Sequence, residues 1–327
     1  SPASRNVRTI PAPMPLAPPV TRITLLLILY RFSFRLRRLN LLAAYRVLGV
    51  KLSLSPGENS IRSQKIMYET LTYTVEDHVA IICLNRPESA NAMNPLMGKE
   101  LNQVSLDVSE DEGVRAVVLT ATGRMFCAGG DLGEFASSGA GARRLMMEMA
   151  ADLHLGLSRL NRNDAPVIAA VNGTAAGAGF SLVMACDLAI ASEESVFTMA
   201  YTNAGLSPDG SSTYFMPRRI GDRRTRELML TNRVLSAEEA LDWGIVNKVV
   251  NKNELMNETM KLANKLSQGP SLAYGKVKSL LDSSFTQGLE TQMELEARAI
   301  SEMVLTEDGQ EGIKSFLEKR KPDFRGK

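Results

Sequence analysis

Three stretches of this chain place small residues where a backbone can contact a ligand. They are residues 124–132 (RMFCAGGDL), 172–180 (NGTAAGAGF) and 199–212 (MAYTNAGLSPDGSS), and in each the pattern predicts a strand, a tight turn and then a helix. Small residues allow close approach, and amides at the start of a helix carry a partial positive charge. Two such amides aimed at one point would form an oxyanion hole. Close helix packing explains each glycine-rich turn about equally well.

The third stretch contains one acid, Asp209, between Pro208 and Gly210. Aspartate is common in such turns because its side chain bonds nearby backbone amides. A single carboxylate can also take a proton from one carbon and return it to another. Both interpretations of Asp209 follow from the residues alone.

Cysteine and histidine are too sparse and too far apart to predict a metal site. Cys83, Cys127 and Cys186 each lie in an apolar run, and the two histidines, His78 and His154, are not at ligand spacing. We expect the cysteines to be small buried side chains in a reducing compartment. His154 falls in the middle of a predicted helix, where a partly buried packing role is expected.

Strands alternate with helices through most of the chain, which predicts an α/β fold with parallel pairing. Strands are expected at 71–75, 79–84, 114–120, 165–171 and 188–191, and helices at 95–109 and 141–160. Asn94 and Pro95 suit the start of the first helix. After Arg218 the pattern is helical, with segments at 223–230, 236–243, 252–267, 271–284 and 288–305. Ser236 and Glu239 have the spacing of a capping box.

The charge of the chain is divided unevenly. Residues 1–66 hold eleven Lys and Arg against one acid, a net +10, which leaves −8 for the remainder. An acidic body gives no reason to expect nucleic acid. The apolar run at residues 23–30 is too short to span a bilayer, so no stable membrane insertion is expected. The basic, Pro- and Arg-rich extension fits an organelle presequence loosely. The favoured alternative is upstream extension of the reading frame with Met67 as the natural start, so that deleting residues 1–66 leaves activity intact.

The motifs in their order resemble the enoyl-CoA hydratase/isomerase (crotonase) superfamily. They are FCAGGDL, AVNGTAAGAGFSLVMACD, GLSPDGSSTYFMPRRIG, LNRPESANAMN and LSAEEALDWGIVNKVV, within residues 67–327. The resemblance implies a ββα spiral core over residues 67–265 and a C-terminal helical trimerisation region over residues 266–327. It implies a homotrimer or hexamer, with coenzyme A as part of the thioester substrate and no permanently bound cofactor. The location would be cytoplasmic, or mitochondrial if residues 1–66 are a genuine presequence.

The same resemblance assigns roles to individual residues. Gly130 and Ala178 match the two amide donors to the thioester oxygen. Tyr201 and Phe135 are expected in the substrate pocket, and Lys319 is a candidate for contact with coenzyme A phosphates. The residues expected to hold coenzyme A are Ala92, Ala128, Gly129, Gly130, Asp131 and Leu132.

Two departures from the family pattern bear on the reaction. A hydratase of this family uses two glutamates, and here their positions hold Ser181 and Tyr201. Subgroups with an acid at the position of Asp209 include dienoyl-CoA isomerases, phenylacetate-pathway ring-opening isomerases and haloaromatic-CoA dehalogenases. The string SPDGSSTYFMPR is most similar to the phenylacetate-pathway isomerases. The resemblance therefore implies a single-carboxylate acyl-CoA isomerase with Asp209 as the catalytic acid/base.

Alternatives remain open at this point. One is a hydratase or other lyase that recruits another acid, such as Glu134. Another is a non-catalytic homologue that binds acyl-CoA. Asp131 is expected to cap a helix or orient its loop, Asp187 to bind a backbone amide, and Trp243 to lie in the core.

Overall fold

The computed structural model describes residues 66–327, and the basic extension expected over residues 1–66 lies outside them except for Ile66. Seven strands form the larger sheet in the order β1-β2-β3-β4-β6-β8-β11. Their bounds are Ile66–Met67, Leu71–Glu76, Val79–Leu84, Ala116–Ala121, Val167–Val171, Leu188–Ser192 and Lys248–Val250. The β1–β2 and β2–β3 pairs are antiparallel and the others are parallel, which confirms the predicted α/β class.

A second sheet of four short strands was not predicted. It has the order β10-β9-β7-β5, with bounds Leu235–Ser236, Val196–Thr198, Thr174–Ala176 and Met125–Cys127. These strands have only two or three residues each, too few for an alternating pattern to stand out. The strands β4, β6 and β8 lead into β5, β7 and β9, and a helix follows each pair, so the chain forms the expected ββα spiral.

The first helices connect the strands of the spiral. They are α3 (Pro95–Glu110), α4 (Leu132–Ser137), α5 (Ala142–Arg162), α6 (Ala178–Ala185) and α7 (Ser212–Ile220). The Asn94 side chain accepts a hydrogen bond from the Met97 amide at 2.9 Å, and Pro95 occupies the first helical position, so the predicted start of α3 is confirmed. Short 3-10 turns lie at Pro87–Ser89, Gly139–Gly141, Thr202–Ala204 and Lys252–Glu254.

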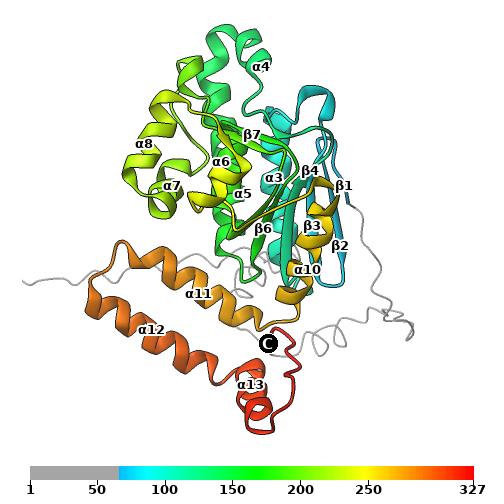
Figure 1. The fold of residues 1–327 in the computed structure, drawn as a ribbon, viewed down its shortest axis with the longest axis vertical. Helices are drawn as coiled ribbons and strands as arrows, with labels where there is room; N and C mark the ends of the chain where they lie inside the picture. The colour runs from blue at the N-terminus through cyan, green and yellow to red at the C-terminus, as the bar shows by residue number, and fades with distance from the viewer. Residues whose placement is uncertain (1–65) are drawn as a thin grey trace, which may run out of the picture. The chain divides into compact units, whose positions relative to one another are not determined.

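The remaining helices cover the end of the chain. They are α8 (Asp222–Thr231), α9 (Ala237–Asp242), α10 (Leu255–Ser267), α11 (Ser271–Ser284), α12 (Leu289–Met303) and α13 (Glu307–Leu317). The predicted capping box at Ser236 and Glu239 is present, with both reciprocal hydrogen bonds. The helix α13 and the strand β11 were not predicted. Figure 1 shows α11, α12 and α13 gathered at one end of the fold, away from α4 and α8.

The larger sheet is apolar on both faces, which explains its unbroken hydrophobic strands. In β4, Ala116 and Val118 join a cluster with Leu255 and Ala263 of α10. Val117 and Leu119 point the other way, into the main core. Successive side chains of a strand alternate between faces, so a strand covered on both sides must be apolar throughout.

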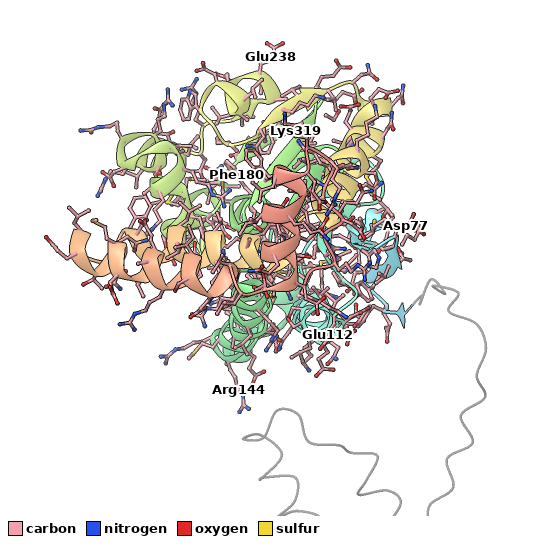
Figure 2. The ribbon with its side chains drawn as sticks, turned by 90° about the horizontal axis from the view of Figure 1, so that it is seen from below. Asp77, Glu112, Arg144, Phe180, Glu238 and Lys319 are labelled. Carbon is pink, nitrogen blue, oxygen red and sulfur yellow. The ribbon has the colours of Figure 1, made fainter. Side chains whose placement is uncertain are left out.

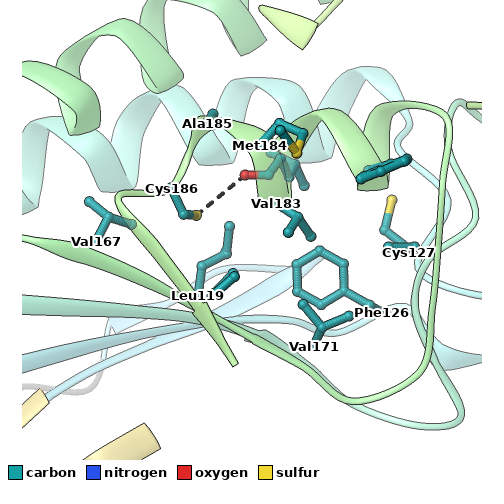
Figure 3. Close-up of a cluster of buried hydrophobic side chains, with 14 of the residues drawn as sticks. Leu119, Phe126, Cys127, Val167, Val171, Val183, Met184, Ala185 and Cys186 are labelled. Atoms are coloured by element: carbon teal, nitrogen blue, oxygen red, sulfur yellow. Dashed lines mark hydrogen bonds between the residues drawn. The ribbon is translucent and has the colours of Figure 1, made fainter. Parts of the chain in front are cut away.

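The helix α6 lies at the centre of the main core, and all eight of its residues are buried. Figure 3 shows its residues Val183 and Met184 near Leu119, Phe126 and Val171 of the surrounding strands. Phe180 of the same helix is fully buried, whereas Arg144 and Glu238 reach outward at the periphery (Figure 2). Burying each large apolar side chain contributes about 1.5–3 kcal/mol, so α6 is held firmly in place.

No helix in residues 66–327 is long and apolar enough to cross a membrane.

Candidate active site

The three small-residue loops leave the same edge of the four-stranded sheet. The strands β5, β7 and β9 are parallel neighbours, and their carboxyl ends therefore meet at one edge. The loop at residues 128–131 follows β5, Gly177 follows β7, and residues 199–211 follow β9. The second sheet is thus the element that brings the predicted stretches together.

Two backbone amides at this edge are free to bind a ligand. Met93 bridges the first loop, since its amide donates to the Gly129 carbonyl at 2.7 Å and its carbonyl accepts from the Asp131 amide at 2.9 Å. The Gly130 amide therefore points away from Met93. Ala178 is the first residue of α6, and the first amides of a helix have no intrahelical acceptor. Among the described residues, neither amide donates a backbone hydrogen bond.

The two loops that carry these amides are in direct contact. Gly129 has a φ of +103°, and a Cβ placed on it would lie 3.2 Å from the Ala176 carbonyl oxygen and 3.6 Å from the Ala178 nitrogen. Only glycine adopts this conformation at this distance without strain. The glycine at position 129 therefore lets the Gly130 loop approach the buried start of α6.

Asp209 lies beside the start of α6 and is held by Tyr201. The Tyr201 hydroxyl donates to Asp209 Oδ1 at 2.6 Å and lies 3.1 Å from the Ser181 hydroxyl. Asp209 keeps 27% of its side-chain surface exposed. The hydroxyls of Ser181 and Tyr201 thus connect α6 to the Asp209 carboxylate.

His154 also lies at this carboxylate, and its expected packing role was wrong. Its side chain is 49% exposed, and Nε2 is 4.0 Å from Asp209 Oδ2. The Gly210 amide donates to the same Nε2 at 3.2 Å. The two residues are 55 positions apart, and only the packing of α5 beside the loop before α7 brings them together. His154 lies beside the buried stripe of α5 and not within it, so the sequence pattern gives no signal of this contact.

A cavity of about 900 Å³ opens beside Asp209 and His154. Tyr214 and Phe215 of α7 line it, as do Lys278 and Asp282 of α11. Asp209 lines this cavity, whereas Gly130 and Ala178 do not.

Burial sets the ionisation of two groups near the site. The pKa of Tyr201 is raised above its usual range, first because burial disfavours the phenolate and then because the Asp209 charge repels it. Tyr201 is therefore a neutral donor to Asp209. Burial likewise raises the pKa of Cys127, at the end of β5, to about 11. Cys127 is buried, as is Cys186, whereas Cys83 is half-buried.

The residues expected around coenzyme A lie on neighbouring segments. The Ala128 amide donates to the Ala90 carbonyl at 3.1 Å, and the Ala92 carbonyl accepts from Arg86 at 2.6 Å. Leu132 is the first residue of α4, next to the loop at residues 128–131, and its apolar side chain is exposed to solvent. A Cβ on Gly130 would lie 2.8 Å from the Phe135 ring, which places that ring over the Gly130 backbone.

Two acids have the structural roles expected from the sequence. Asp131 caps α4 by accepting from the Glu134 amide and forms an ion pair with Arg86 at 3.2 Å. Asp187 accepts from the Val167 amide at 2.8 Å and also pairs with Lys278. Glu134, the alternative acid, is exposed on α4.

The other predicted positions lie apart from this edge. Trp243 is partly buried and packs against the main core. Lys319 is exposed at the end of α13. Within residues 66–327, no three His, Cys, Asp or Glu side chains are placed to hold a metal ion.

Comparison with known proteins agrees with the fold. The family model described as enoyl-CoA hydratase/isomerase matches residues 74–327. A Rhodobacter capsulatus protein named "Probable enoyl-CoA hydratase" is 37% identical over 80% of this chain and 99% of its own length. The 1,2-epoxyphenylacetyl-CoA isomerase of Escherichia coli is also 37% identical, over 80% of this chain and all of its own.

Solved structures give the same result. The crystal structure of an enoyl-CoA hydratase from a Polaromonas species superimposes with a TM-score of 0.75 at 32% identity, covering 78% of this chain and 99% of the other. The family model spans well over half of this chain, and both sequence relatives are matched over nearly their whole length. The chain therefore belongs to the enoyl-CoA hydratase/isomerase family, the crotonase superfamily.

Proposed function

We propose that the chain is an acyl-CoA isomerase that shifts a double bond, or opens an epoxide-type ring, with Asp209 as its single proton carrier. One observation carries this proposal. Asp209 is held by Tyr201 beside the amide loops, while Ser181 and Tyr201 occupy the positions of the two hydratase glutamates. Neither position holds a carboxylate, so the chain lacks the two acids with which a hydratase of this family adds water.

The Gly130 and Ala178 amides would stabilise the anion that forms when a proton leaves the carbon next to the thioester. Both amides lack a backbone acceptor among the described residues, and Ala178 is buried at the start of α6. Each donor aimed at a developing oxyanion contributes about 3–4 kcal/mol to lowering the barrier. The thioester oxygen would sit between the two loops.

Asp209 would take the proton from one carbon and return it to another on the same face of the substrate. Its Oδ1 is engaged by Tyr201, which leaves Oδ2 for the proton. For the rest of the substrate, we propose the backbone of Ala92, Ala128, Gly129, Asp131 and Leu132 as the coenzyme A contacts. Tyr201 and Phe135 would bound the acyl group.

Residues 266–327 are proposed as an oligomerisation region of a trimer or hexamer. The helices α12 and α13 expose large apolar side chains, among them Ile300, Phe316 and Leu317, which are 73%, 81% and 74% exposed. Contiguous exposed apolar surface is typical of protein contacts. Light scattering after gel filtration measures the assembly, and a monomer would overturn this part of the proposal.

A second candidate is nucleophilic displacement at an activated haloaromatic ring, and the Asp209–His154 distance of 4.0 Å favours it. Asp209 would attack the ring carbon and expel halide, forming an aryl ester. Water, giving a proton to His154, would then attack the Asp209 carboxyl carbon and release the phenol and the carboxylate. His154 Nε2 already accepts the Gly210 amide, so this reaction would need that contact to open. The isomerase proposal needs no such change.

The test is a proton-exchange screen in deuterated water with straight-chain and aromatic acyl-CoA thioesters. We expect deuterium at the α or γ carbon of at least one substrate, with formation of its isomer. Asp209→Asn should reduce both by about 10²–10⁴-fold, the usual contribution of a general acid/base. Undiminished isomerisation by that variant would overturn the mechanism.

The same reactions separate the alternatives. Heavy-oxygen water incorporated into a hydroxyacyl product identifies a hydratase, and halide release identifies displacement. Binding of acyl-CoA with neither exchange nor conversion identifies a non-catalytic homologue.

A further inference from the structure

His154 makes two contacts with the Asp209 turn that no sequence motif indicates. Its Nε2 accepts the Gly210 amide at 3.2 Å and lies 4.0 Å from Asp209 Oδ2. A backbone amide can only donate, so Nε2 must carry a free lone pair. This hydrogen bond therefore requires a neutral imidazole that carries its proton on Nδ1.

The Gly210 amide is the point at which the catalytic turn is attached to α5. Gly210 has a φ of +60°, and a Cβ on it would lie 2.8 Å from Ser181 Cβ and 3.7 Å from Leu153. The turn is thus confined between α6 on one side and α5 on the other. The hydrogen bond from the Gly210 amide to His154 ties this turn to α5 at the residue next to Asp209.

A proton on Nε2 would reverse the role of His154. Protonated imidazole has two donors and no acceptor, so the Gly210 amide would lose its partner. The new N–H would face Asp209 Oδ2 at ion-pair distance, the oxygen that receives the substrate proton in the mechanism proposed above. Oδ1 is already engaged by Tyr201.

Other charged and titratable groups line the same cavity as His154. They are Arg162 at the end of α5, Tyr214 of α7, and Lys278 and Asp282 of α11. Lys278 is paired with Asp187 at 2.8 Å, so it is neutralised locally. Among the residues that the structure describes, Asp209 is the acid within ion-pair distance of His154 Nε2, at 4.0 Å.

We propose that neutral His154 is a positioning residue for Asp209, and that its protonation releases the Gly210 amide and occupies Oδ2. This inference rests on the proposed role of Asp209 as proton carrier. It predicts that activity falls as the pH falls through the range in which His154 becomes charged. Histidines change charge between about pH 5 and pH 8, so the effect belongs to the acidic limb of the rate profile.

Two substitutions of His154 distinguish its role as hydrogen-bond acceptor for the Gly210 amide from the effect of its positive charge. His154→Gln keeps an oxygen that can accept the Gly210 amide but cannot titrate, whereas His154→Leu removes the acceptor. We expect His154→Gln to keep kcat within about threefold and to lose the histidine part of the acidic limb. His154→Leu should lower kcat by about tenfold or more at every pH with little change in KM, since small displacements of a catalytic group are costly. Ser158→Ala, one turn along α5 and lining the same cavity, is the matched control and should behave as wild type.

Equal activity and an unchanged acidic limb in His154→Leu would overturn the inference. So would an equal loss in both His154 variants when circular dichroism shows them folded, because the acceptor would then be irrelevant.

A measurement without turnover distinguishes this inference from the proposed function. The chain has two histidines, so nitrogen-15 histidine labelling gives two sets of ring signals in the full-length protein. His78 Nδ1 lies 2.8 Å from the Gly113 carbonyl and serves as the internal reference.

We expect an unprotonated His154 Nε2 at neutral pH, and a Gly210 amide signal that shifts together with the His154 ring signals as the pH is lowered. A protonated Nε2 at neutral pH would overturn the positioning role even if isomerisation is observed. The expected signals without any isomerisation would leave the contact intact and refute only the reaction.

Discussion

Tyr201 donates its hydroxyl proton to Asp209 Oδ1 across 2.6 Å, and the two residues come from the same loop between β9 and α7. The Tyr201 ring is partly buried against the main core, and its hydroxyl also lies 3.1 Å from the Ser181 hydroxyl of α6. A carboxylate next to a fixed neutral donor keeps one oxygen occupied and one available. This pair therefore gives the lone acid of the site a defined orientation.

Tyr201→Phe should lower kcat by about 10–100-fold, because a hydrogen bond to a charged group is worth about 1.5–3 kcal/mol. Ser181→Ala removes only the longer contact and is the matched control, with a loss of a few-fold at most. Steady-state kinetics on the substrate identified by the exchange screen measures both. Similar rates in all three proteins would show that the tyrosine does not orient Asp209.

The raised pKa of Tyr201 adds a prediction about pH. A raised pKa means that the phenol stays protonated above its ordinary titration near pH 10. The wild type should therefore lose no activity through Tyr201 between about pH 7 and pH 9.5, and Tyr201→Phe should have the same alkaline profile. An alkaline loss present in the wild type and absent from the variant would contradict this.

Gly129→Ala should disrupt both the site and the fold. The new Cβ would meet the Ala176 carbonyl at 3.2 Å in a backbone conformation with φ of +103°. Such strain costs about 1–3 kcal/mol, and its relief would move the Gly130 amide away from α6. Urea unfolding and the isomerase assay measure the two effects. Gly141→Ala is the control, since its φ is −80° and nothing lies within 4 Å of the added carbon.

Lys278→Ala should destabilise the protein by about 3–5 kcal/mol, the usual result of removing one partner of a buried ion pair. Lys278 is 9% exposed, pairs with Asp187 and also donates to the Ala165 carbonyl at 3.1 Å, so it joins α11 to the core. Lys276→Ala on the same helix removes an exposed pair with Glu302 and should cost less than about 1 kcal/mol. Equal urea midpoints for the two variants would show that the buried pair does not stabilise the fold.

The cysteines should react slowly with thiol reagents in the native protein. Burial raises the pKa of Cys127 to about 11 and that of Cys186 to about 12, and it also raises the pKa of Cys83. The thiolate is the reactive form, so reactivity at neutral pH is low and increases only as the pH approaches these values. Labelling with iodoacetamide before and after unfolding in urea measures the difference. Rapid native labelling of Cys127 would contradict the closed packing of β5 against α6.

Local signals in the sequence determined much of the fold and part of the site. The capping residues Asn94 and Ser236 set helix starts because their side chains bond amides only a few residues away. Asp131 was predicted as a helix cap for the same reason. The long apolar strands were evident because both faces of the larger sheet are covered.

Features that depend on distant contacts needed the tertiary structure. The short strands β5, β7 and β9 carry too few residues for a pattern, yet their parallel pairing brings the three loops to one edge. His154 was predicted to be a packing residue because the sequence shows only its place within a helix. Its contact with Gly210 depends on where α5 packs in the fold.

The sequence by itself determined which residue types border the site. Only the packing of α5, α6 and the loop before α7 decided that Asp209 lies between a tyrosine and a histidine, because proximity across 55 residues depends on how buried surfaces fit together.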